Sequence, residues 1–283
     1  MTVRKADFAG SWYPGSALEC ERQIKDFLSD GPPALEGGIK GLGGIVPHAG
    51  WHFSGKIAAL VLAAMQTDGH PDVMAVFGMH LAPGHPNFIM AEGAWETPFG
   101  PLEIAEDVAG RLTQRFSFQL ETPNRHVQDN TIELQLPFIR YLFPDTRIVP
   151  MGVAPAEESL EIGRAFVDEC ASLGYKSKIL GSTDLTHYGP NYGFTPKGTG
   201  EQAYEWVREE NDPAFIEKVV ALDPEAAMKE GVGSHNACCA GAAAAAVAAA
   251  KHLGASHGQV VQYATSYDKN PGPSFVGYVG VVF

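Results

Sequence analysis

Short apolar runs that end at glycine, proline or a polar cluster recur along the chain, and this pattern predicts β-strands. The predicted strands are Gly43–Pro47, Val73–Phe77, Arg147–Pro150, Lys178–Gly181, Gln259–Tyr263 and Val276–Val282. Between them lie segments whose apolar residues recur every three or four positions, which is the period of a helix with one buried face. The predicted helices are Ser54–Met65, Asp107–Phe116, Thr131–Phe143 and Glu157–Leu173.

An alanine-rich run, Ala237–Ala250, adds one more helix of a different kind. Alanine is the strongest helix former, and a helix that is small or apolar on every side is expected to be buried and closely packed. The run is shorter than the roughly 20 residues that a bilayer requires. Because strands and helices alternate and no shift in composition divides the chain, we predict one α/β domain over residues 1–283.

Composition narrows the range of partners. The chain has 283 residues, 45% of them hydrophobic, which is enough for a full core. Its 20 basic and 33 acidic side chains give a net charge of −13, which argues against nucleic acid as a partner. The N-terminal residues Met1–Asp7 contain no apolar segment of the secretion type. We therefore expect a cytoplasmic protein without a membrane partner, and homo-oligomers remain open.

The cysteines have no CxxC spacing, so they are expected to be free thiols or metal ligands rather than disulfides. They are Cys20, Cys170, Cys238 and Cys239. The last two precede the alanine run, where Ser234 or Asn236 would serve as the helix N-cap. A thiol in the first turn of a helix ionises more easily, which makes this adjacent pair a candidate source of a thiolate, although small buried side chains would give the same sequence.

Three histidines follow predicted strands directly: His48, His80 and His187. In open α/β sheets, ligands and catalytic groups collect at the carboxyl edge of the strands, so the three imidazoles are expected to converge if the strands are parallel neighbours. Each taken alone could equally cap a turn. Imidazole with thiolate suits zinc, copper or iron. Two histidines and one anionic ligand with open positions indicate a reactive ferrous site, whereas four ligands in a closed set indicate structural zinc.

A polar stripe also runs through Arg125–Phe138. Asp129 is placed to cap a helix there, and Glu133 follows about one turn later. Spacing alone leaves open whether His126, Asp129 and Glu133 take part in function or form the solvated face of that helix.

Several motifs resemble those of the Memo-like family, which includes the microbial AmmeMemoRadiSam system protein B. They are Phe8–Pro14 (FAGSWYP), Val46–Gly55 (VPHAGWHFSG), Glu133–Phe138 (ELQLPF), Ser182–Gly189 (STDLTHYG) and Ser274–Tyr278 (SFVGY). The resemblance covers essentially the whole chain. It implies an α/β/α sandwich around a mixed sheet, similar to the class III extradiol ring-cleavage dioxygenases, with a non-haem metal in a cleft.

The resemblance also assigns roles to residues. It implies that His48 and His80 are metal ligands, that Cys239 supplies the thiolate, and that His187 is a catalytic acid and base. Asp184, three residues before His187, is placed to orient an imidazole.

Two positions depart from the family pattern. The motif at Gly78–His80 is shorter than the usual Gly-Pro-Ser-His, so His85 is the alternative ligand. Asn130 stands where the family has a histidine, and His126 is a candidate for the same space.

These features predict an iron-dependent redox enzyme that acts on a small molecule, with copper or zinc as the other metals. The alternatives are a module that binds phosphorylated tyrosine peptides in the same cleft, as the resemblance also implies, and a zinc-dependent hydrolase. We expect the substrate cleft to be lined by Trp51, His52, Phe53, His126, Asn130 and Tyr188.

Overall fold

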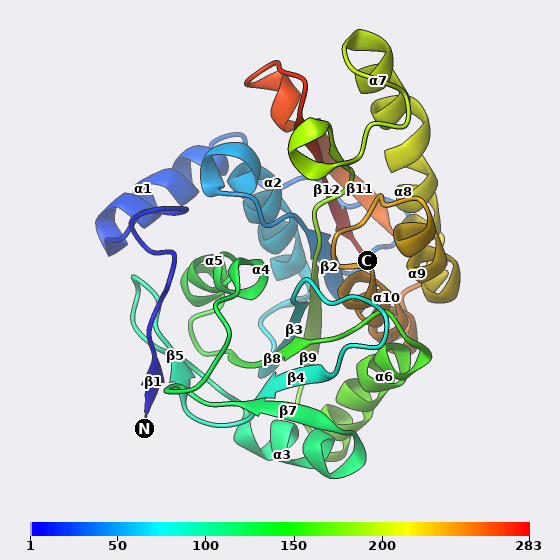
Figure 1. The fold of residues 1–283 in the computed structure, drawn as a ribbon. Coiled ribbons are helices and arrows are strands. Elements are labelled where there is room, and N and C mark those ends of the chain that lie inside the picture. Colours follow the sequence, from blue (N-terminus) through cyan, green and yellow to red (C-terminus); the bar gives the residue numbers. More distant parts are fainter. Residues whose placement is uncertain (1) are drawn as a thin grey trace.

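One large sheet forms the centre of the protein in the computed structural model, which describes residues 2–283 (Figure 1). Its strands are β2 Gly43–Val46, β3 Val73–Gly78, β4 Asn87–Met90, β7 Phe118–Glu121, β8 Arg147–Gly152, β9 Ser177–Ser182, β10 His187–Tyr188, β11 Gln259–Thr265 and β12 Phe275–Val282. Within the described residues their order is β10-β12-β2-β9-β3-β8-β4-β7, and β11 pairs with β12. A small separate sheet joins β1 Val3–Arg4, β5 Ala94–Trp95 and β6 Leu102–Glu103.

The middle of the large sheet is parallel. Strands β2, β9, β3 and β8 run in one direction, and β12 and β4 join them antiparallel on either side. The carboxyl ends of the four parallel strands therefore lie at the same edge of the sheet. Every strand predicted from the sequence is present, whereas the short strands β4, β7 and β10 of the large sheet were not predicted.

Helices cover both faces of the sheet. They are α1 Ala17–Phe27, α2 Trp51–Ala64, α3 Glu106–Arg115, α4 Asn130–Glu133, α5 Leu136–Leu142, α6 Glu157–Ser172, α7 Glu201–Trp206, α8 Asp212–Val220, α9 Pro224–Gly233 and α10 Ala240–His252. Figure 1 shows α1, α2, α4 and α5 on one side of the sheet, and α6, α9 and α10 on the other. The predicted α/β/α sandwich around a mixed sheet is confirmed.

Two glycines show how close the layers lie. A Cβ atom at Gly44 would lie 2.6 Å from Val61 in α2, and one at Gly181 would lie 2.7 Å from Ala246 in α10. Gly181 pairs with Ile45, the neighbour of Gly44, so the two glycines face opposite sides of the sheet. Each helix packs where the strand presents no side chain.

The alanine helix α10 is buried along its length, as the composition predicted. Small side chains allow α6 to approach it closely, because a Cβ atom at Gly163 would lie 2.4 Å from the carbonyl oxygen of Ala245. The helix begins at Ala240, so both adjacent thiols precede its first turn. The predicted caps are wrong: Cys239 occupies the N-cap position, and the Asn236 side chain instead donates to the carbonyl of Asn211. Among residues 2–283, no helix combines the length and apolar character that crossing a bilayer requires.

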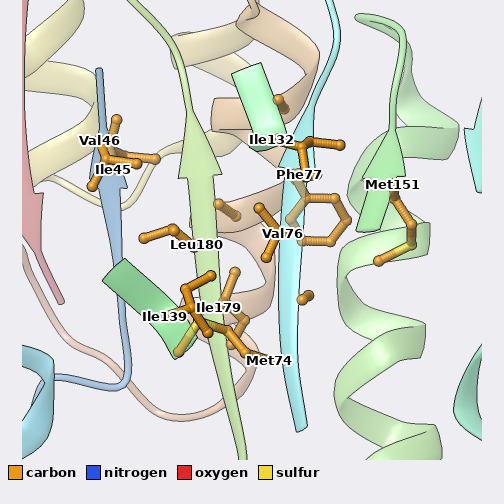
Figure 2. Packing of buried hydrophobic residues seen from close by; sticks show 14 of the residues in the cluster. Ile45, Val46, Met74, Val76, Phe77, Ile132, Ile139, Met151, Ile179 and Leu180 are labelled. Atoms are coloured by element: carbon orange, nitrogen blue, oxygen red, sulfur yellow. The ribbon is translucent and has the colours of Figure 1, made fainter. Parts of the chain in front are cut away.

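Apolar side chains from neighbouring strands interlock between the layers. Figure 2 shows side chains of β2, β3 and β9 packed with Ile132, Ile139 and Met151. Val76 and Phe77 are consecutive in β3 and both are fully buried, which indicates that β3 is covered on both faces. The parallel strands therefore form a rigid support for the groups at their carboxyl ends.

The predicted helix Thr131–Phe143 is two helices, α4 and α5, separated at Leu134 and Gln135. Pro137 has no backbone N–H to donate to the carbonyl of Glu133, so a continuous helix would lose a hydrogen bond there. The Gln135 side chain donates instead to the carbonyl of Pro47, just before His48. The break thus connects α5 to the edge of the sheet where the histidines lie.

Candidate metal centre

Two imidazoles and two thiols meet at the carboxyl edge of the parallel strands. His48 follows β2, His80 follows β3, and Cys238 and Cys239 precede α10. One ligand atom from each lies within 4.8 Å of the others. The convergence predicted from strand ends is present for His48 and His80, and the pair of thiols joins them.

A tight turn fixes the position of His80. Met79 has a positive φ of 69°, which is uncommon for a residue with a side chain, and its N–H donates to Thr131 Oγ1 at 2.7 Å. The preceding Gly78 is required, because a Cβ atom there would lie 2.2 Å from the same hydroxyl oxygen. The shorter motif therefore brings His80 into the group, while His85 is exposed and lies outside it.

Hydrogen bonds fix the tautomer of His48. Its Nδ1 lies 3.0 Å from Ser182 Oγ, and that hydroxyl donates its single proton to the carbonyl of Thr131 at 2.7 Å. Ser182 can only accept from the imidazole, so Nδ1 carries a proton. The other nitrogen, Nε2, lies 3.2 Å from His80 Nε2 and 3.2 Å from Cys238 Sγ. In its neutral form His48 therefore presents the electron pair of Nε2 to the centre of the group.

The two thiols differ sharply. The Cys238 sulfur accepts from the N–H of Asp184 at 3.3 Å, and lies 3.8 Å from the sulfur of Cys239. Burial opposes ionisation of Cys238, but the Cys239 thiol and the imidazoles of His48 and His187 outweigh it and hold its pKa well below the usual value. Burial, together with the neighbouring Cys238, raises the pKa of Cys239 well above the usual value. Cys238 is thus the thiol of the pair that ionises more readily.

Asp184 ties the two sides of the group together. Its carboxylate accepts from the N–H of His48 at 2.7 Å, and its carbonyl accepts from the N–H of Cys238 at 3.1 Å. Burial alone would lower the pKa of His48, but the charges of Asp184 and Cys238 raise it to about 9. The site therefore attracts positive charge, whether as protons or as a metal ion.

His187 lies at the border of the group rather than in it. Its Nε2 is buried, makes no hydrogen bond to a described residue, and lies 3.9 Å from the carboxylate of Asp184. Burial opposes protonation here too, yet Asp184 and Cys238 raise the pKa of His187 to about 10. The ring packs against Tyr192, with centroids 4.9 Å apart.

Two cavities open beside the group. One, of about 570 Å³, is lined by His48, His80 and Asp184, and its wall also includes His52, Phe53 and Asn130, three of the residues expected at a substrate cleft. The other, of about 590 Å³, exposes Cys238. The Asn130 side chain donates to the carbonyl of His48 at 3.1 Å, so it supports the turn that carries this ligand.

Two residues assigned to the cleft lie elsewhere. Trp51 is only 2% exposed, stacks on Phe138 and donates to the carbonyl of Leu134, because α2 begins at Trp51 and turns its ring into the core. Tyr188 is fully buried, since its position in β10 places the ring against Phe275. Neither lines either cavity beside the metal group. The prediction was wrong for both, although each is next or close to a site residue in sequence.

The polar stripe of Arg125–Phe138 is structural. Asp129 caps α4 as predicted, accepting from the N–H of Ile132. Glu133 is buried and accepts from the backbone of Asp7 and Phe8, which fastens the N-terminal segment. The His126 Nε2 lies 3.5 Å from Asp7, and the side chain lines neither cavity, so it does not replace the missing histidine at position 130.

Sequence reasoning did not identify the residues that support the group. Thr131 and Ser182 orient His80 and His48 through side-chain hydroxyls, and Asp212 accepts from both the N–H and the hydroxyl of Thr186, next to His187. Hydroxyl and carboxylate side chains are common throughout the chain, so only their three-dimensional contacts distinguish these three residues from other polar residues. Asp212 follows directly after a π-helical segment, Val207–Asn211, and such segments often occur at functional sites.

Comparison with known proteins agrees with these motifs. The family model for Memo-like proteins matches residues 4–282. A MEMO1 family protein of Pyrobaculum aerophilum is 34% identical, with 100% of this chain and 99% of that protein covered. A MEMO1 family protein of Methanopyrus kandleri is 33% identical, with 99% and 98% covered. A crystal structure of an uncharacterized Escherichia coli protein, JW3007, is 12% identical with a TM-score of 0.47, over 75% of this chain and 86% of that one. The chain belongs to the Memo-like protein family.

Proposed function

We propose that the protein is a metal-dependent redox enzyme that uses iron and acts on a small molecule. The observation that carries the proposal is the group of two imidazoles and two thiols whose ligand atoms lie within 4.8 Å of one another at the wall of open cavities. Nitrogen and sulfur ligands suit iron, copper or zinc and disfavour magnesium or calcium.

His48, His80 and Cys238 are the three ligands of this proposal. The His48 Nε2 lies within 3.2 Å of both partners, and Cys238 is the thiol with the lowered pKa. The family resemblance pointed to Cys239 instead, yet the pKa of that thiol is raised, and it is the Cys238 sulfur that lies 3.2 Å from His48 Nε2. Three protein ligands leave room for a substrate in the coordination sphere, which is the arrangement of catalytic rather than structural sites.

A bound ferrous ion would supply one-electron redox and Lewis-acid chemistry at this position. The residues of the chain perform the remaining tasks. His187 borders both cavities, and its raised pKa of about 10 makes it an imidazolium whose Nε2 has no partner among the described residues, so it is placed to give a proton to a substrate and take it back. Asp184 stabilises the protonated form of His187, and Ser182 keeps His48 in the tautomer that binds a metal.

The proposal includes a cytoplasmic location, because the described cysteines are all free thiols and a reducing compartment preserves them. The same donor set would also hold zinc, so a zinc-dependent hydrolase is the second candidate. Metal identity separates the two, because zinc has no redox chemistry.

Metal analysis of anaerobically purified protein tests the proposal. We expect about one iron per chain and a loss of at least roughly tenfold in His48→Gln and Cys238→Ser. Cys239→Ser is the matched control, since it changes the adjacent thiol, and should retain the metal. Zinc at full occupancy with no iron would favour the hydrolase. A protein without any metal that binds phosphotyrosine peptides would instead be the binding module.

A further inference from the structure

The candidate metal centre opens on two cavities, and a carboxylate side chain lines only one of them among the described residues. The first cavity, of about 570 Å³, is the one beside the imidazoles of His48 and His80. The second, of about 590 Å³, meets the same centre from the side of the Cys238 sulfur. His187 and Tyr192 belong to the walls of both, so this pair of packed rings is shared by the two cavities.

The second cavity is built from apolar groups of six separate segments. They are the loop after His80, the loop after β8, the loop after β9, the loop after β10, the end of α9 and the start of α10 with the residues just before it. The apolar residues among its walls are Leu81, Ala82, Pro83, Pro155, Leu185, Phe194, Val232, Ala237 and Ala240. No lysine, arginine, aspartate or glutamate is among the described residues that line it.

The polar groups of this cavity are few, and most of them lie near the metal centre. Cys238 and His187 belong to the centre or its border, and the ring of His235 packs against Phe194 with centroids 5.3 Å apart. Away from Cys238 and His187, a charged group of a ligand would lose its hydration without gaining an ion pair here. An apolar group would instead release water from apolar walls at about 25 cal/mol per Å². The walls therefore favour an uncharged, apolar occupant.

We infer that the second cavity binds an aliphatic or aromatic group of the substrate, and that the substrate reaches the metal centre from the Cys238 side. This inference rests on the proposed function for its chemistry and names the substrate class: a small molecule with a bulky apolar part. The first cavity, which contains Asp184 and Asn130, then remains for a polar part of the substrate or for a second small reactant.

Two half-exposed apolar side chains allow a matched test. Val232 is 38% exposed on the wall of the second cavity, and Phe53 is 37% exposed on the wall of the first. Val232→Arg places a charge in the apolar cavity, and Phe53→Arg makes the same change across the His187–Tyr192 pair. Because both positions are partly exposed, both variants should fold. Val232→Trp, which fills the space without a charge, is the second variant.

The probe is N-phenyl-1-naphthylamine, an uncharged aromatic molecule whose fluorescence increases in apolar surroundings. We expect Val232→Arg and Val232→Trp to weaken its binding by at least about tenfold and Phe53→Arg by less than about twofold, because a buried charge or a filled cavity removes the apolar site. Equal affinity in the parent protein and both Val232 variants, or a larger loss in Phe53→Arg, would overturn the inference.

Metal content measured on the same samples separates this inference from the proposed function. Iron in the parent protein with no Val232-dependent probe binding would overturn the inference and leave the proposed function standing. Val232-dependent binding in a protein that takes up no metal would support the apolar site and overturn the proposed function. Neither result depends on knowing the reaction.

Discussion

The two ends of strand β9 bury charged groups with opposite results. At the amino end, Lys178 is 1% exposed and donates to the carbonyls of Gly41 and Met65. Burial lowers its pKa to about 8. Past the carboxyl end, His48 is also buried and His187 is half-buried, yet their pKa values rise to about 9 and about 10.

The difference lies in the partners rather than in the burial. The partners of Lys178 are neutral carbonyls, which satisfy its protons but do not offset the loss of hydration. The histidines face the carboxylate of Asp184 and the sulfur of Cys238, whose negative charge outweighs the same loss. The amino edge is thus a closed structural site, and the carboxyl edge is one that attracts a cation.

The largest expected effect comes from Ser182, at the carboxyl end of β9. Ser182→Ala leaves the Nδ1 proton of His48 without an acceptor and no longer fixes the metal-binding tautomer. We expect metal affinity to fall by about tenfold, measured by competition with a chelator. Ser177→Ala, at the other end of the same strand, is the control and should retain full affinity. An equal loss of metal affinity in Ser182→Ala and Ser177→Ala would contradict the distinction between the two ends of β9.

Asp184→Asn tests the origin of the raised pKa values. The carboxylate stabilises the imidazolium of His187, so a neutral amide should lower the His187 pKa from about 10 by more than about one unit. The measurement is an NMR titration of the imidazole in metal-free protein. Tyr192→Phe is the control: it keeps the ring that packs on His187 and should leave the His187 pKa unchanged. An unchanged pKa in Asp184→Asn would assign the effect to Cys238 alone.

The main strands and helices were predictable because their signals are local. An apolar run such as Val73–Phe77 identifies a two-sided strand wherever it packs, and the histidines after β2 and β3 follow from strand ends alone. The parallel order of these strands then brings His48 and His80 together. The pairing of these two histidines is therefore a consequence of the sheet topology rather than of a particular sequence motif.

The choice between Cys238 and Cys239 was not predictable. The two residues are adjacent, and the direction of each sulfur depends on the backbone at the start of α10, where Cys239 has the N-cap position. In the folded chain, the contact of Cys238 with His48 at 3.2 Å distinguishes them. The same limit applies to Tyr188, whose neighbour His187 faces the cavities while its own ring packs inward.

Lys178→Met tests the amino end through the pH dependence of stability. Because the folded pKa of about 8 lies below the unfolded value of 10.5, the unfolded chain binds more protons between these values. Stability from this group therefore rises with pH across that window and is lost as pH falls through about 8, with a slope of at most about 1.4 kcal/mol per pH unit. Urea denaturation from pH 7.5 to 10.5 measures the slope, which the variant should lack.

The metal content of Lys178→Met tests whether a change at the amino end of β9 affects the candidate metal site at the carboxyl end. We expect it to match that of the parent protein, since Lys178 contacts none of the metal group. A loss of metal together with an unchanged pH slope would contradict the separation of the two ends.

Trp51→Phe gives the smallest expected effect and tests where the metal site ends. Trp51 lies three residues after His48, but its ring stacks on Phe138 with centroids 4.1 Å apart, and its Nε1 donates to the carbonyl of Leu134 at 3.0 Å. Phenylalanine keeps most of the packing and removes the hydrogen bond, so the free energy of unfolding should fall by about 1 kcal/mol. Metal content and probe binding should not change, because the side chain lies in the core. A loss of metal with no loss of stability would contradict this placement and indicate that Trp51 contributes to the cleft.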